Sequence, residues 1–169
     1  AAGSYVVYKG TGTNVSVTAL SAETVYYFAV YEFNGAATPN YRTHDEPVAN
    51  RTTLAAEPGT QASNIGIRGP AEVSMSGFTW TDGNGAGRIL VAKAGSPVDA
   101  FPVDGTAYTA HTNFGSGNQI GTGNYVVWVG SGQPERISSL ARDTVYHFRL
   151  FEYNGSAATI NYNTNTAAG

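Results

Sequence analysis

The sequence predicts an all-β fold in which two antiparallel sheets pack face to face as a sandwich. Three observations predict it. Charged residues make up only 12% of the chain, so Thr, Asn, Ser and Gly must supply the polar surface, and this composition suits short strands and tight turns. Short apolar runs alternate with polar residues between turn signals. No segment shows a sustained 3.6-residue period, which argues against helices.

The strands can be placed in order along the second part of the chain. Seven runs are predicted as strands, over residues 62–68, 72–81, 88–93, 124–129, 136–140, 144–153 and 161–166. The first is expected to end at Gly69-Pro70, and Asp82-Gly83-Asn84-Gly85 is expected to turn the chain after the second. Seven strands joined by turns indicate two sheets.

An internal repeat organises the chain. Residues 3–35 align without a gap over residues 123–155, an offset of 120 positions, and 14 of these 33 pairs are identical. With one inserted residue the match continues, which places Asn40-Tyr41 over Asn161-Tyr162. A repeat of this length is too long for a solenoid and suits a string of sandwich domains.

The repeat predicts the domain organisation. Residues 1–53 are expected to be the C-terminal half of one sandwich, and residues 61–169 a complete one. The Pro- and Gly-containing stretch 54–60 is the expected linker between them. Within the complete unit, the Gly-rich stretch at about 95–122 is longer than a turn requires, so it is predicted to be an insertion.

Alternation assigns the two faces of the repeated strand. The inward residues are predicted to be Tyr26, Phe28 and Val30 in the first copy, and Tyr146, Phe148 and Leu150 in the second. The outward face carries a row of aromatic residues, namely Tyr27, Tyr31, Phe33, Phe151 and Tyr153. This row is the candidate contact surface, since exposed rings can stack on sugars or seat another protein. Alternatively, the insertion covers the row with its own apolar residues.

One motif occurs in both copies and resembles a known family. Each copy has a Leu, then Thr-Val-Tyr, at the start of the repeated strand, with Leu20 and Tyr26 in the first and Leu140 and Tyr146 in the second. This pattern resembles the tyrosine corner of fibronectin type III domains. The resemblance implies that each Tyr hydroxyl bonds to backbone a few residues upstream while its ring packs inward. It also implies that Trp80 is the core Trp of the family's second strand.

The long insertion and the stretches 91–96, 102–106 and 114–127 resemble a repeat variant of large secreted bacterial surface proteins. The resemblance implies a spacer or adhesive module outside the cell, at the cell surface, without catalytic residues.

Composition indicates which partners are not expected. The net charge of the chain is −3, so the sequence does not predict a basic surface for binding nucleic acid. The chain has no cysteine, and no apolar run approaches the ~20 residues that a membrane span needs.

No pattern in the sequence predicts catalytic, cofactor-binding or metal-binding residues. Glu32 and Glu152 are copies in successive units rather than a catalytic pair. The spacing of His44, His111 and His147 matches no metal or triad motif. The turns at 82–85 and 104–106 contain oxygen ligands but lack the full series that calcium requires, which favours ordinary tight turns.

These observations predict a non-catalytic extracellular module that serves as spacer, surface display element or filament subunit. A carbohydrate-binding accessory module is the alternative, with glycans stacked on Tyr27 or Tyr31. The first unit lacks the strands that would cover its inward residues. Either the strands lie upstream in a longer parent chain, or another copy supplies them by strand complementation. The expected partners are therefore neighbouring repeats or other copies of the chain.

Overall fold

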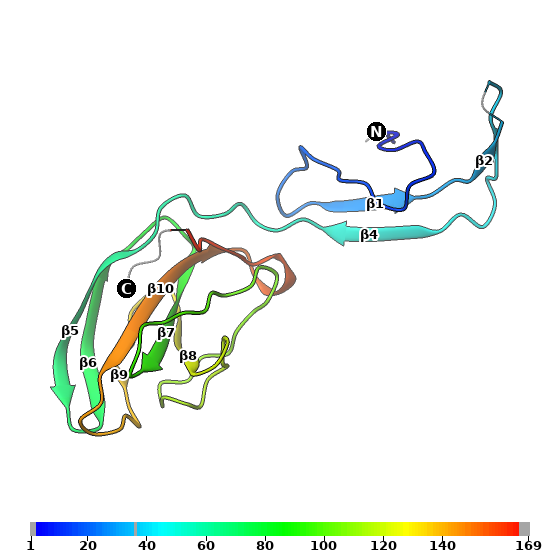
Figure 1. Ribbon diagram of the computed structural model, residues 1–169. Coiled ribbons are helices and arrows are strands. Elements are labelled where there is room, and N and C mark those ends of the chain that lie inside the picture. The colour runs from blue at the N-terminus through cyan, green and yellow to red at the C-terminus, as the bar shows by residue number, and fades with distance from the viewer. Residues whose placement is uncertain (1–2, 36, 166–169) are drawn as a thin grey trace. The chain divides into compact units, whose positions relative to one another are not determined.

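The chain forms two compact units, Ala1–Thr53 and Leu54–Gly169, here called unit 1 and unit 2. The computed structural model describes residues 3–35 and 37–165 (Figure 1). Over these residues the regular elements are strands, apart from a single turn of 3₁₀-helix at Ala157–Thr159. The all-β prediction is therefore confirmed.

Unit 2 contains two antiparallel sheets. The three-stranded sheet has the order β5-β6-β9, built from β5 (Ser63–Ala71), β6 (Ser74–Thr81) and β9 (Arg136–Ile137). The four-stranded sheet has the order β11-β10-β7-β8, built from β11 (Asn161–Tyr162), β10 (Tyr146–Asn154), β7 (Gly87–Ala94) and β8 (Asn124–Gly130). Each of the seven predicted strands is present, and Figure 1 shows β5 and β6 beside β10 and β7.

Three strand ends differ from the prediction by three residues or more. β5 continues through Gly69-Pro70 to Ala71 instead of ending there. Because β5 is an edge strand that pairs only with β6, the missing N–H of Pro70 is tolerated. β9 ends at Ile137, short of the predicted Leu140. β11 covers only Asn161–Tyr162 of the predicted 161–166, and Thr166 lies outside the described residues.

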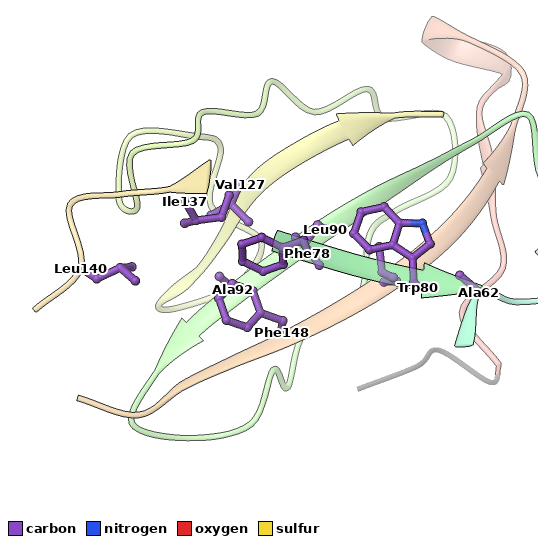
Figure 2. Close-up of a cluster of buried hydrophobic side chains, with 10 residues drawn as sticks. Ala62, Phe78, Trp80, Leu90, Ala92, Val127, Ile137, Leu140 and Phe148 are labelled. Carbon is purple, nitrogen blue, oxygen red and sulfur yellow. The ribbon is translucent and has the colours of Figure 1, made fainter. Parts of the chain in front are cut away.

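The main core of unit 2 lies between the two sheets. Alternate residues of β7 and β10 point toward alternate residues of β6 in the opposite sheet, and Figure 2 shows Phe78, Leu90 and Phe148 at the centre. The buried members are Ala62, Phe78, Trp80, Leu90, Ala92, Val127, Ile137, Leu140, Phe148 and Leu150. The Phe78 and Phe148 rings meet edge to face, with centroids 5.2 Å apart. Burying each large side chain contributes roughly 1.5–3 kcal/mol, so this cluster is the main source of stability.

A second core lies on the other face of the four-stranded sheet. Its strand residues include Ile89, Val91, Val126 and Phe151, and the insertion covers them with Val98 and Ile120 among others. Partly buried Ala100, Tyr108 and Ala110 complete the cover. The insertion is thus a third layer of the unit.

The described residues of unit 1 form four short strands. β1 (Val25–Ala29) pairs antiparallel with β4 (Val48–Thr52), and β2 (Phe33–Asn34) pairs with β3 (Asn40–Tyr41). Tyr26 and Phe28 are half-buried, whereas Val30 is 62% exposed. A two-stranded sheet is marginally stable by itself, and the inward residues of β1 are less buried than Phe148 and Leu150 of β10.

Candidate functional site

The tyrosine corner has the same geometry in both units. In unit 2 the hydroxyl of Tyr146 accepts a hydrogen bond from the backbone N–H of Ala141 at 2.8 Å. In unit 1 the hydroxyl of Tyr26 accepts one from Ser21 at 2.9 Å. In each case the donor lies five residues upstream, and Tyr146 packs against the main core.

The backbone around the two corners matches as well. Glu23 and Asp143 both adopt positive φ, at 49° and 50°, in the turn before the strand. Thr24 Oγ1 donates to the carbonyl of Ala22 at 2.9 Å, and Thr144 Oγ1 donates to that of Arg142 at 3.0 Å. The two segments therefore fold locally in the same way.

The structure separates the candidate aromatic row into two environments. In unit 2, Phe151 is fully buried and lies edge to face with Phe101 of the insertion, at 5.8 Å between centroids. Tyr153 is half-buried and packs on Tyr162 at 5.7 Å. Of the two alternatives, cover by the insertion is the one that unit 2 shows, and Phe151 is not available as a contact residue there.

In unit 1 the corresponding row is open. Tyr27 is 80% exposed and Tyr31 is 47% exposed. Phe33 is half-buried, because the Lys9 ammonium lies 5.1 Å from its ring centroid and the ring of Tyr41 packs beside it at 5.4 Å. The row is therefore not one continuous surface.

Hydrogen bonds fix the insertion to the sheet beneath it. Tyr162 N–H donates to Asp104 Oδ1 at 2.8 Å, and its hydroxyl donates to the Thr106 carbonyl at 3.0 Å. Burial raises the pKa of the Tyr162 phenol, and the neighbouring Tyr108 and Tyr153 raise it further. The hydroxyl is thus held in its neutral, donating form.

An ion pair fixes the start of the insertion. Lys93 Nζ donates to both carboxylate oxygens of Asp99, at 2.6 and 2.7 Å, and Asn124 Nδ2 donates to the same group at 2.9 Å. These hydrogen bonds, first that from Lys93 and then that from Asn124, lower the pKa of Asp99. Together with the contacts at Asp104 and Thr106, this ion pair anchors the first half of the insertion.

A buried ion pair that the sequence did not reveal lies at one end of unit 2. The carboxylate of Glu152 is fully buried, and the guanidinium of Arg88 donates to it from Nε at 2.8 Å. The backbone N–H groups of Gly83 and Gly85 each donate to it at 3.0 Å. We call this group, with the turn at 82–85, the clamp.

Both charged groups of the clamp are paired and hydrogen-bonded within unit 2. Arg88 Nη1 donates to the Ser131 carbonyl at 2.7 Å and lies 2.8 Å from Asp82 Oδ1. Buried charges are tolerated when each is paired and hydrogen-bonded. Glu152 therefore ties β10 to β7 and to the turn that follows β6, and its geometry indicates a structural role. Glu32, its counterpart in unit 1, is exposed.

Residues 54–60, predicted as a linker, are instead a packed part of unit 2. Three asparagine side chains donate to its carbonyl oxygens at 2.8 Å each: Asn161 to Ala55, Asn154 to Ala56 and Asn163 to Pro58. Ala55 N–H also donates to the Thr159 carbonyl at 2.8 Å, and Pro58 is fully buried. The pattern of the segment itself does not predict this packing, because the amides that hold it lie about 100 residues further along the chain.

The turns at 82–85 and 104–106 and the histidines do not form a metal site in the described residues. Asp82 is engaged by Arg88, Asn84 Oδ1 accepts from Thr60 N–H at 2.8 Å, and Asp104 accepts from Tyr162. Within residues 3–35 and 37–165, no group of three or more His, Asp or Glu side chains is placed to hold a metal ion. His111 Nδ1 accepts from the N–H of Asn113, which is a local turn contact.

The fold and these contacts define an all-β protein with a two-sheet sandwich, a covering layer and an internal clamp. No protein-family model matches the chain, and no curated protein or solved structure matches it either. In the described part of the chain, no helix has the length and apolar character to cross a membrane.

Proposed function

We propose that the chain is a non-catalytic structural module of an extracellular, cell-surface array of sandwich units, acting as a spacer for display or adhesion. The observation that carries the proposal is the shared corner: Tyr26 and Tyr146 make the same hydrogen bond, 120 positions apart. Two such corners in one chain support an array of similar units, as in other repeat proteins.

The attachment of residues 54–60 also supports this proposal. A spacer must transmit load without unravelling where one unit passes into the next. In unit 2 three side-chain amides and one backbone bond hold the incoming segment. The clamp contacts the residue that follows this segment, since Gln61 Oε1 accepts from Glu152 N–H at 2.6 Å. Both features support a load-bearing role for the start of unit 2.

Single-molecule stretching of the full chain between handles at its two ends tests the proposal. Unit 2 is expected to resist and then unfold in one event that lengthens the chain by roughly 350–400 Å, at ~3.3–3.6 Å per extended residue. Arg88→Met, which breaks the clamp, should lower the unfolding force, and Arg142→Met, at an exposed ion pair with Glu72, should not. Extension of the wild-type chain without a force peak would contradict a load-bearing role.

A further inference from the structure

Lys93 and Asn124 face each other across two neighbouring strands. They are directly opposed in the register of β7 and β8, so their side chains lie on the same face of the sheet. That face is the one that the insertion covers, because the next pair along it, Val91 and Val126, belongs to the second core. A primary amine and a side-chain amide are thus held side by side at the margin of an apolar layer.

Asp99 of the insertion joins these two side chains. One of its carboxylate oxygens, Oδ1, accepts from Lys93 Nζ at 2.7 Å and from Asn124 Nδ2 at 2.9 Å. The two nitrogen atoms are therefore less than about 6 Å apart. Lysine has a flexible stem, so rotation about its last bonds can bring Nζ to the ~3–3.5 Å from the amide carbon that a reaction requires.

The amide of Asn124 is polarised and shielded from water. Its Oδ1 accepts from the backbone N–H of Asp99 at 3.3 Å, and its Nδ2 also donates to the Thr122 carbonyl at 3.1 Å. Asn124 is fully buried, whereas 15% of the Lys93 side chain and 66% of the Asp99 side chain are exposed. Exclusion of water keeps hydrolysis from competing at the amide carbon. The N–H of Asp99 is placed to stabilise negative charge on the amide oxygen.

We infer that Lys93 and Asn124 form an intramolecular isopeptide bond between Nζ and Cγ, and that Asp99 transfers the protons. The site brings together a nucleophile, a shielded carbonyl group and a carboxylate that contacts both. This modification goes beyond the proposed function, which requires no covalent link.

The reaction balances without an oxidant or a cofactor. The Asp99 carboxylate takes a proton from the Lys93 ammonium, and the neutral Nζ adds to Cγ of Asn124. Asp99 then gives its proton to Nδ2, the Cγ–Nδ2 bond breaks, and ammonia leaves. The second proton that Nζ loses departs through Asp99 with the ammonia, as ammonium. One amide replaces another, and Asp99 returns to its ionised form.

Asn124 rather than Asp99 is the carbonyl group that reacts. The hydrogen bonds from Lys93 and then from Asn124 lower the pKa of Asp99, so its carboxylate is ionised at neutral pH. A carboxylate carries a negative charge that repels the electron pair of an amine. The amide of Asn124 is neutral, and the ammonia that it releases is lost to solvent, which drives the exchange forward.

The bond closes residues 94–123, which include the insertion, into a covalent loop. Such a cross-link restricts the unfolded chain as a disulfide does, and the chain has no cysteine with which to form one. Under load the loop is withheld from extension. The lengthening of roughly 350–400 Å applies to unit 2 without the bond, and the bond shortens it by roughly 100 Å, at ~3.3–3.6 Å per residue.

Intact mass and tryptic mapping of the full chain test the bond. After prolonged incubation at neutral pH, wild type should be lighter than its sequence mass by one ammonia. Trypsin should not cut after Lys93, because the acylated amine carries no charge, so residues 89–136 should be recovered as one peptide. Full mass together with cleavage after Lys93 would overturn the inference.

Substitutions separate this bond from other losses of ammonia. The chain contains three Asn-Gly pairs, which can also release ammonia by cyclising on the next backbone nitrogen. Lys93→Arg keeps the cation beside Asp99 but removes the reactive amine, and Asp99→Ala removes the proton carrier. Both variants should keep the full mass, with tryptophan fluorescence as the check that unit 2 is folded. Lys9→Arg, at the only other lysine, should still lose ammonia.

Two further results would contradict the assignment. Loss of ammonia that persists in Lys93→Arg would place the reaction at an Asn-Gly pair. Loss of water in place of ammonia would indicate a bond from Lys93 to Asp99 instead of Asn124. Wild type of full mass that still unfolds with a force peak would remove this bond and leave the load-bearing role standing, so the two proposals fail separately.

Discussion

The guanidinium of Arg88 and the carboxylate of Glu152 form an ion pair inside unit 2, with 2.8 Å between Nε and Oε1 and almost no solvent contact for either side chain. Removing one partner of a buried pair leaves a charge without compensation. Loss of either partner of the clamp is therefore expected to destabilise unit 2.

Arg88→Met is expected to destabilise unit 2 by about 3–5 kcal/mol, because Glu152 would remain buried with only backbone donors. Urea denaturation followed by tryptophan fluorescence measures this, since Trp80 and Trp128 both lie in unit 2. Arg142→Met is the matched control and should cost less than about 1 kcal/mol. Equal effects of the two substitutions would show that the clamp contributes no more than a surface pair.

Tyr146→Phe removes the corner hydroxyl but keeps the ring, so it isolates one hydrogen bond. Unit 2 should lose about 1 kcal/mol, the net worth of such a bond. Tyr26→Phe makes the same change in unit 1, and the tryptophan-detected transition of unit 2 should not move. A shift of that transition by Tyr26→Phe would mean that the two units unfold together.

Ile120→Ala tests whether the insertion layer stabilises the sheet beneath it. Ile120 is 5% exposed in the second core, so its truncation should cost about 2–4 kcal/mol. Val103→Ala, in the same segment but 60% exposed, should change stability by less than about 0.5 kcal/mol. If Ile120→Ala is also neutral, the layer does not contribute to folding.

Alkaline pH is expected to weaken unit 2 through Tyr162. Burial raises the pKa of its phenol in the folded state above the value of ~10 in the unfolded chain. The unfolded state therefore releases its proton first, so this contribution is fully present below pH ~10 and is lost as the pH rises through the folded-state pKa. Denaturation midpoints measured from pH 8 to 12 should fall, and Tyr162→Phe should flatten the fall. Tyr27→Phe, at an exposed ring of unit 1, should leave the slope unchanged.

Periodicity and turn chemistry were sufficient to predict the strands of unit 2 and the faces of β10. Phe148 and Leu150 lie in the main core as predicted, and Phe151 lies on the opposite face. These features are local, because each depends on which side of a strand a residue points to. The same reasoning failed for Gly69-Pro70, where the position of β5 at the edge of its sheet overrides the turn signal.

The clamp and the attachment of residues 54–60 could not be predicted in this way. Arg88 and Glu152 are 64 residues apart, and Asn161 is 106 residues from Ala55. The only sequence signal for the clamp is an Arg at the head of an otherwise apolar run, which is equally typical of a strand end at the surface. Such contacts depend on the order of the strands within each sheet. The pattern of residues along a single strand carries no information about that order.

β7 is the strand that both cores share. Its first six residues are buried, since Leu90 and Ala92 face the opposite sheet while Ile89 and Val91 face the insertion. Its amides are bonded to β8 and β10 within the sheet, and both of its faces are covered. The slowest hydrogen exchange of unit 2 is therefore expected along β7, and the unit is expected to melt in one step.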